Sequence, residues 1–355
     1  MERTILDQIY LHNVAEFEER ALLPGRRLQR FPREVREALT DKGRTKAAES
    51  SGCELRFVTD ANVFRLTLAA QEKDGQVLVF KGDLFHAAYT LKAGVLTTLE
   101  LEQPDRFAEV PEALLTSAAF APQVWRVYFD RYSAIVADID TFGYGIRPPR
   151  KEEMPSLTML AYGSSITHGV GALSHYNCYA QQTGRRLGVD VLNMGLSGSC
   201  FCEPEVARHF AAREDWDFAY LELGVNMRAV VPVEKFETRV NRMLDEMIQR
   251  HPEKPIFVTT IYPNRATHFF DTSHPYAVAE LAFNDVLKRY WETKRHKQLF
   301  LLDGREIMTE FTSLTTDLIH PSEYGHMRMG EQLARLLQPE VERLRMAKKR
   351  EDDNK

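Results

Sequence analysis

Short apolar runs alternate with helical segments through the second half of the chain, and this alternation constrains the fold more than any other feature. The helical segment with the clearest periodicity is residues 233–248, and another, residues 333–344, closes the domain. Strands that alternate with helices form a mostly parallel sheet with helices on both faces. Residues 151–345 are therefore predicted to form an α/β domain around a five-stranded sheet. The five apolar runs of strand length lie at residues 157–162, 189–194, 218–223, 256–261 and 299–303.

The first half of the chain has a different texture. Several short strands separated by turn signals such as Asp74-Gly75 indicate an antiparallel β-sandwich. We assign residues 1–150 to this domain and expect a short helix at residues 34–39. The predicted strands are runs of β-branched and aromatic residues at positions 53–58, 63–68, 77–80, 95–101 and 124–129.

Two further segments mark boundaries. Residues 147–153 contain two prolines among charged residues, which is typical of a linker. Residues 348–355 are all polar or charged, and residues 346–355 are predicted to be an unstructured tail.

Composition excludes several classes of protein. The 355 residues include 46 Lys and Arg against 51 Asp and Glu, a net charge of -5, which excludes a generally basic nucleic-acid binder and gives no reason to expect an anionic membrane partner. No apolar run approaches the roughly 18 residues that span a bilayer. The first eight residues lack the pattern of a secretion signal, and four cysteines are too few for a disulfide framework. We expect a soluble cytoplasmic protein whose Cys200 and Cys202 are idle thiols.

Four loops that follow predicted strands contain chemically useful side chains. Ligands of an open parallel sheet bind beyond the carboxyl ends of its strands, so these loops are expected to meet at one edge. Together they contribute serines, glycine turns, an amide side chain and an Asp/His pair. The loops are residues 163–169, 195–199, 224–227 and 317–321.

These residue types suit acyl transfer. A serine hydroxyl is a weak nucleophile until a base such as imidazole removes its proton, and an aspartate can fix the tautomer of that imidazole. The tetrahedral oxyanion then needs preorganised donors. The backbone N–H groups of Ser165 and Gly198 and the side-chain amide of Asn226 are candidates, and Gly198 lets the backbone approach a substrate closely.

The same blocks resemble, in order, the four sequence blocks of the SGNH (GDSL-like) hydrolase superfamily over roughly residues 155–340. The blocks are residues 163–167, Gly198, residues 224–226 and residues 317–320. The resemblance implies a flavodoxin-like three-layer fold. It also implies that Ser165 is the nucleophile, His320 the base and Asp317 its orienting carboxylate, with Ser165, Gly198 and Asn226 forming the oxyanion hole.

Three segments resemble the sequence of one branch of that superfamily, whose members carry an N-terminal, jelly-roll-like β-sandwich as some carbohydrate esterases do. The segments are residues 162–169, 195–198 and 203–205. The resemblance implies deacetylation of sugars or acetylated oligosaccharides. The chain departs from the pattern at two positions. Ser164 stands where the family usually has Asp, and Met227 stands where an Asp often follows the Asn, which puts loop rigidity and substrate choice in doubt.

Other residues have competing interpretations. Ser164 is a neighbouring candidate for the nucleophile, and His326 is expected to be a surface or capping residue. His168, Tyr262 and Met227 are candidate substrate contacts, although a structural role for His168 is equally compatible with the sequence. Residues 262–276 suit either a pocket wall or a loop packed on its own side chains. The Asp/His pair lacks further ligands at metal-binding spacing, so no metal is predicted.

Aromatic residues of the sandwich are open to two interpretations. Trp125, Tyr128 and Tyr132 suit sugar binding if they are exposed, but alternating strand positions favour a core role in a domain that only shapes one wall of the cleft.

The favoured function is hydrolysis of a short-chain ester, acetyl by resemblance, through an acyl-enzyme that needs no cofactor. The partner is a small-molecule or oligosaccharide ester, with no nucleic acid or membrane, and homo-oligomerisation stays open. An acyltransferase, a lipase or thioesterase, and a sugar-binding protein with a decayed hydrolase domain are the alternatives.

Overall fold

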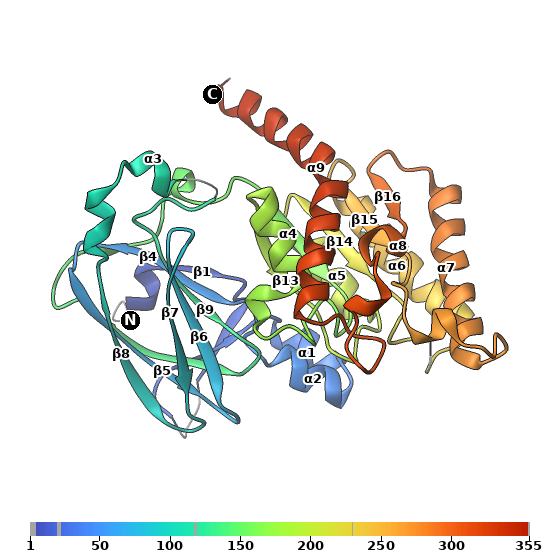
Figure 1. The fold of residues 1–355 in the computed structure, drawn as a ribbon, viewed down its shortest axis with the longest axis horizontal. Coiled ribbons are helices and arrows are strands. Elements are labelled where there is room, and N and C mark those ends of the chain that lie inside the picture. Colours follow the sequence, from blue (N-terminus) through green and yellow to red (C-terminus); the bar gives the residue numbers. More distant parts are fainter. Residues whose placement is uncertain (1–4, 20–22, 117–118, 229, 354–355) are drawn as a thin grey trace. The chain divides into compact units, whose positions relative to one another are not determined.

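The computed structural model describes residues 5–19, 23–116, 119–228 and 230–353, which divide into two units (Figure 1). The first unit comprises Met1–Arg33 and Ala47–Ser156, and the second comprises Glu34–Lys46 and Leu157–Lys355. This division differs from the predicted boundary at residue 150 in two ways. The first unit extends to Ser156, and residues 34–46, called the N-terminal excursion below, belong to the second unit. The excursion carries α1 (Arg33–Ala38), which the sequence predicted, and α2 (Asp41–Ala47).

The predicted linker at residues 147–153 is part of the first unit. Strand β11 (Ile146–Arg147) pairs with β4 (Glu54–Thr59), and the Glu153 carboxylate accepts two hydrogen bonds of 2.7 Å from the Arg147 guanidinium. These contacts fix the segment, so the chain passes to the second unit only after Ser156.

Two antiparallel sheets form the first unit, as the sequence predicted. Both contribute to one core, which includes Leu55 and Phe57 of β4 and Leu66 and Leu68 of β5 (Val63–Ala70). The predicted runs include neither β10 (Ala134–Asp140) nor the half-exposed strand β7 (Leu84–Leu91), whose burial has no regular two-residue period. One sheet has the order β1 (Tyr10–His12), β4, β9 (Trp125–Phe129), β6 (Gly75–Lys81) and β7 (Leu84–Leu91), with β11 beside β4. The other has the order β2 (Glu16–Glu19), β3 (Arg26–Gln29), β10 (Ala134–Asp140), β5 (Val63–Ala70) and β8 (Leu96–Glu102). A short helix, α3 (Glu112–Leu115), lies between β8 and β9.

The aromatic residues singled out in this unit are core residues. Trp125 and Tyr128 are fully buried and Tyr132 is 1% exposed. None of the three offers a ring face to a sugar, so the core interpretation is confirmed.

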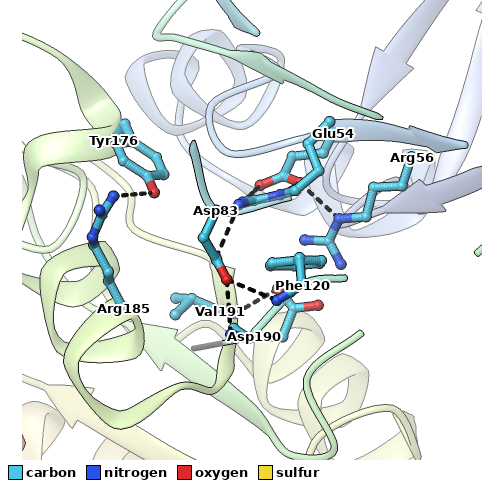
Figure 2. Close-up of polar contacts among 10 residues, drawn as sticks. Glu54, Arg56, Asp83, Phe120, Tyr176, Arg185, Asp190 and Val191 are labelled. Atoms are coloured by element: carbon cyan, nitrogen blue, oxygen red, sulfur yellow. Dashed lines mark hydrogen bonds and ion pairs between the residues drawn. The ribbon is translucent and has the colours of Figure 1, made fainter. Parts of the chain in front are cut away.

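A buried ion cluster lies on the other face of β4 and β9 (Figure 2). The Glu54 carboxylate accepts hydrogen bonds of 2.7 Å from Arg56 and of 2.7 and 3.0 Å from Arg126. The Phe120 ring lies 3.9 Å from the Arg126 guanidinium, and the backbone N–H of Phe120 donates to Asp83. Burial alone would raise the pKa of Glu54, but the two guanidinium groups outweigh it and lower the pKa to about 2.

The second unit is built on a five-stranded sheet in which every pairing is parallel, as predicted. Met159 and Val191 share a core with α4 (Tyr179–Leu187) and α9 (Glu323–Asp353) on one face. Tyr162 points to the opposite face, where its ring packs against Phe210 of α5 (Pro204–Ala212). The strand order is β13 (Asp190–Asn193), β12 (Thr158–Tyr162), β14 (Phe218–Glu222), β15 (Ile256–Thr259) and β16 (Leu299–Leu302). The helices are α4 (Tyr179–Leu187), α5 (Pro204–Ala212), α6 (Val233–Arg250), α7 (Pro275–Lys294), α8 (Gly304–Ile307) and α9 (Glu323–Asp353).

The predicted unstructured tail is wrong. Helix α9 continues to Asp353, and Lys348 donates a 2.9 Å hydrogen bond to Asp217. The residues after Met346 are mostly strong helix formers, so they extend a helix that is already nucleated by its packed N-terminal half. Within the described ranges no helix combines the length and apolarity that a membrane span requires.

The ion cluster generates a prediction about stability. Glu54→Gln should lower the free energy of unfolding of the first unit by about 3–5 kcal/mol, because it leaves two buried guanidinium groups without their carboxylate. Because the folded pKa lies below the unfolded one, the wild type should lose this stabilisation as the pH falls from about 4.5 toward 2. Urea denaturation at several pH values measures both effects. Glu100→Gln, which removes an exposed carboxylate paired with Arg65, is the control and should cost less than about 1 kcal/mol. Equal losses in the two variants would contradict the prediction.

Candidate active site

Three side chains from distant parts of the second unit form a hydrogen-bonded chain. Ser165 lies in the turn after β12, whereas Asp317 and His320 lie in the loop before α9. The Ser165 Oγ is 2.8 Å from the His320 Nε2, and the His320 Nδ1 is 2.6 Å from the Asp317 Oδ2. The structure therefore brings together the three residues that the sequence assigned to catalysis.

The Asp317 carboxylate is fixed by its own loop. Its Oδ1 accepts hydrogen bonds from the backbone N–H groups of Ile319 (2.9 Å) and His320 (3.0 Å) and from the Thr315 hydroxyl (2.8 Å). Partial burial would raise the pKa of Asp317, but these bonds and the one from the His320 ring hold it well below its usual range. The carboxylate thus stays ionised, with Oδ2 left for the imidazole.

This arrangement selects the tautomer of the neutral imidazole. An ionised carboxylate accepts only, so the His320 Nδ1 carries the proton and donates it to Asp317. The Nε2 atom is then the acceptor for the Ser165 hydroxyl. Ser165 itself is 7% exposed, which limits its contact with water to one side.

A buried carboxylate that the sequence analysis did not single out holds the serine turn. The Glu222 Oε2, at the end of β14, accepts hydrogen bonds of 2.7 Å from both the backbone N–H and the hydroxyl of Ser164. It also accepts a 3.1 Å bond from the Thr167 hydroxyl. Any side chain at Gly163 would collide with this carboxylate, because a Cβ there would lie 2.6 Å from Oε2.

Glu222 differs from an ordinary surface glutamate in its titration. Burial raises the pKa of Glu222 to about 7, although its hydrogen bonds with Ser164 and Thr167 favour the charged form. A lone carboxylate at the end of an otherwise apolar strand was the signal available in the sequence, since buried charges need dedicated partners.

The neighbouring strand holds the other side of the turn. The Asn193 side chain donates a 2.8 Å hydrogen bond to the Thr167 carbonyl and accepts a 2.9 Å bond from the Gly195 N–H. Gly195 lies so close to His168 that a Cβ would be 2.5 Å from its backbone nitrogen. The turn is therefore clamped between β13 and β14.

The three predicted anion donors keep their N–H groups available. The Asn226 Oδ1 accepts a 3.1 Å bond from the Cys200 N–H, which leaves the Nδ2 end of the amide for another partner. Gly198 has a φ of 67°, a conformation that favours glycine. Across the described ranges we find no acceptor for the Ser165 N–H, the Gly198 N–H or the Asn226 Nδ2.

The three predicted substrate contacts are not placed to touch a substrate. His168 is 1% exposed, Tyr262 is 2% exposed and Met227 is fully buried. His168 packs on the His175 ring, and the Tyr262 hydroxyl bonds with that of Tyr220. Their side chains are therefore packed inside the second unit, because apolar and aromatic groups next to the sheet are drawn into the core.

His326 is not a surface residue, contrary to one of its two predicted roles. It is fully buried, its Nδ1 accepts the Tyr179 N–H at the start of α4, and its Nε2 donates to the Val170 carbonyl at 3.0 Å. It therefore satisfies a backbone donor at a helix start, which is a capping function.

The loop after β15 is held by side chains outside it, and Pro263, Phe269 and Thr272 line a pocket, so neither of its two predicted interpretations is excluded. Asn264 donates a 2.8 Å bond to Glu280 and accepts a 3.0 Å bond from Arg228, all three being buried. The Arg265 N–H donates to the Leu318 carbonyl at 2.7 Å, which braces the loop of Asp317 and His320. The four cysteines are buried, and none of them forms a disulfide within the described ranges.

Comparisons with known proteins identify the α/β unit. Residues 157–338 match the GDSL-like Lipase/Acylhydrolase family. No curated protein sequence is significantly similar to the chain.

Solved structures share the fold of almost the whole chain. One is the salicylyl-acyltransferase SsfX3 from a tetracycline biosynthetic pathway, with a TM-score of 0.75 and 16% identity over 92% of this chain and 93% of that one. Another is a family two carbohydrate esterase from Cellvibrio japonicus, with a TM-score of 0.61 and 12% identity over 94% and 96%. A third is a family two carbohydrate esterase from Clostridium thermocellum in complex with cellohexaose, with a TM-score of 0.57 and 14% identity over 82% and 93%.

The buried carboxylate generates a prediction about pH. Because the folded pKa of Glu222 lies above the unfolded value, its contribution to stability should decrease as the pH rises from about 4.5 to 7, by about 3 kcal/mol in total. The difference in unfolding free energy between the wild type and Glu222→Gln should therefore change over this window. Denaturant titrations at half-unit pH steps measure it. Two curves that run parallel from pH 4.5 to 7 would show that Glu222 titrates normally.

Proposed function

Because the chain belongs to the GDSL-like lipase/acylhydrolase family, we propose that it is a serine esterase that hydrolyses short-chain O-esters, acetyl esters above all, of a carbohydrate or similar small molecule. The observation that carries this proposal is the continuous hydrogen-bonded chain from Ser165 through His320 to Asp317. A nucleophile, a base and a group that orients the base are thereby within bonding distance of one another.

In the first half of the reaction, the Ser165 oxygen attacks the ester carbonyl while the His320 Nε2 takes its proton. The Asp317 carboxylate stabilises the imidazolium that forms. The carbonyl oxygen becomes an oxyanion, which accepts hydrogen bonds from the Ser165 and Gly198 N–H groups and the Asn226 amide.

When this intermediate collapses, the bond to the alcohol oxygen breaks, the imidazolium gives its proton to the leaving alkoxide, and the acyl group stays on Ser165. In the second half, His320 removes a proton from a water molecule, which attacks the acyl carbonyl. The bond to the Ser165 oxygen then breaks, the imidazolium returns the proton to that oxygen, and the carboxylic acid leaves. Every proton in this cycle moves through one imidazole, so the chain's own residues suffice for the reaction.

The substrate class rests on shared architecture. Family two carbohydrate esterases share this two-unit fold, and one of them was solved with cellohexaose. This likeness supports a carbohydrate ester as the substrate, whereas the acetyl group rests on the sequence resemblance stated above.

A second candidate reaction is acyl transfer to an alcohol other than water. It is favoured by the match to a salicylyl-acyltransferase, which covers 92% of this chain. The two reactions share the acyl-enzyme and differ in the acceptor. Product analysis with added acceptor alcohols separates them, and a chain-length series of nitrophenyl esters tests for a lipase or thioesterase.

Covalent labelling tests the proposed nucleophile. A fluorophosphonate probe should add once to the wild-type protein, on Ser165, as measured by intact mass and peptide mapping. Labelling should disappear in Ser165→Ala and slow strongly in His320→Ala, because the hydroxyl is then not activated. Ser164→Ala is the matched control and should still be labelled on Ser165. A folded wild-type protein that is not labelled would instead favour the sugar-binding alternative.

Kinetics of two variants test the supporting groups. Asn226→Ala should lower kcat about 10²–10³-fold with little change in KM, because an oxyanion donor acts mainly in the transition state. Asp317→Asn should lower kcat by up to about 10⁴-fold, because an amide at this position allows the wrong imidazole tautomer.

Steady-state hydrolysis of 4-nitrophenyl acetate measures both changes. Thermal denaturation shows whether both variants are folded. If either folded variant kept a kcat within about twofold of the wild type, the role assigned to its residue would be wrong.

A further inference from the structure

A lysine from the N-terminal excursion lies against the turn that carries Gly198. Lys42 belongs to helix α2, and the end of its side chain lies against the Gly198 backbone. A Cβ at position 198 would overlap the Lys42 Nζ and Cε atoms. The ammonium therefore occupies the space next to the Gly198 backbone where other residues would have a side chain. Both residues belong to the second unit.

The helix that carries Lys42 is anchored to the same turn. The Thr40 and Ser199 hydroxyls are 2.8 Å apart, and the Gly43 N–H donates to the Thr40 hydroxyl at 3.1 Å. Gly43 is buried, and a Cβ there would lie 2.6 Å from the Ser199 Oγ. Close packing of a glycine on the turn thus fixes the register of α2 and, with it, the position of Lys42.

The Lys42 ammonium has no internal partner. It makes no hydrogen bond or ion pair with any residue that the structure describes, and the residue is exposed. The acidic neighbour on α2, Asp41, is instead paired with Arg44. A cation is therefore held beside an anion-binding turn without an anion of the chain to neutralise it.

We propose that Lys42 forms an anion-binding subsite beside the Gly198 turn, and that the natural ester carries a carboxylate or phosphate close to its reacting carbonyl. An ammonium is a compact point charge that binds either anion. The inference rests on the proposed esterase function and narrows its substrate to a negatively charged ester.

A role for Lys42 in stabilising the oxyanion itself is less consistent with the structure. Three donors are already available for that oxygen, and Lys42 is exposed, where a charge is screened by water. A charged group of the substrate, in contrast, reaches the ammonium from the solvent side and needs only one short hydrogen bond.

Matched ester pairs test the proposal. On the alcohol side, 4-acetoxybenzoate and 4-acetoxyphenyl phosphate are each compared with neutral methyl 4-acetoxybenzoate, which separates carboxylate from phosphate. On the acyl side, 4-nitrophenyl hydrogen succinate is compared with 4-nitrophenyl butyrate. The measured quantity is the ratio of kcat/KM for the anionic ester to that for its neutral counterpart.

The wild type should favour the anionic ester in at least one pair. Lys42→Met should lower that ratio about 2- to 5-fold, which is the usual effect of an exposed ion pair, and Lys42→Arg should restore most of it. Lys235→Met is the control, since it removes the same charge from an exposed lysine of α6 and should leave the ratio unchanged. Thermal denaturation of each variant shows whether it is folded.

The remaining outcomes overturn the proposal in distinguishable ways. If Lys42→Met leaves the ratio unchanged, the anion subsite is refuted and the proposed esterase is not. The same holds if the variant lowers kcat/KM equally for charged and neutral esters. A wild type that cleaves neutral esters through Ser165 without any preference for charge also refutes only the subsite. A wild type that neither cleaves any of the esters nor reacts with a fluorophosphonate overturns the proposed function and the subsite together.

Discussion

The hydrogen bonds that a single buried carboxylate accepts from the serine turn are the constraint on which the site depends. Ser164 and Thr167 bind Glu222 from either side of Ser165, so the turn cannot rotate without leaving a buried charge unsatisfied. With the turn fixed, the Ser165 hydroxyl lies within 2.8 Å of the His320 ring. The geometry that suits catalysis therefore begins beneath the site, at the end of β14.

Glu222 also gives a physical account of the departure at Ser164. The related enzymes usually have an aspartate there, whereas in this chain the carboxylate is supplied by the next strand and position 164 supplies the donors. The loop rigidity that the sequence put in doubt is thus supplied by the contact of Glu222, at the end of β14, with the serine turn after β12.

The sequence predicted what local pattern determines. Apolar runs located all five parallel strands, and the order of four short blocks singled out Ser165, Asp317 and His320, which lie within hydrogen-bonding distance of one another. It could not locate contacts between distant segments, such as that of Glu222 with the turn or that of Lys42 with Gly198. Burial was also misjudged for Tyr262 and His326, because a polar side chain gives no local indication that its hydrogen-bond partner lies far along the chain.

The excursion of residues 34–46 shows the same limit on a larger scale. Its two short helices lie within the sequence of the β-rich unit, yet they pack with the α/β unit. Nothing in their composition indicates which unit they join. Contacts such as those of Gly43 and Thr40 with Ser199 and of Lys42 with Gly198 do so.

The central claim is that Ser165 carries the acyl group during turnover. Acid quenching of the enzyme during hydrolysis of an acetyl ester, followed by peptide mapping, tests it most directly. The account predicts one acetyl group on the peptide that contains Ser165. Acetyl found on Ser164 or elsewhere, or hydrolysis by Ser165→Ala at the wild-type rate, would contradict it.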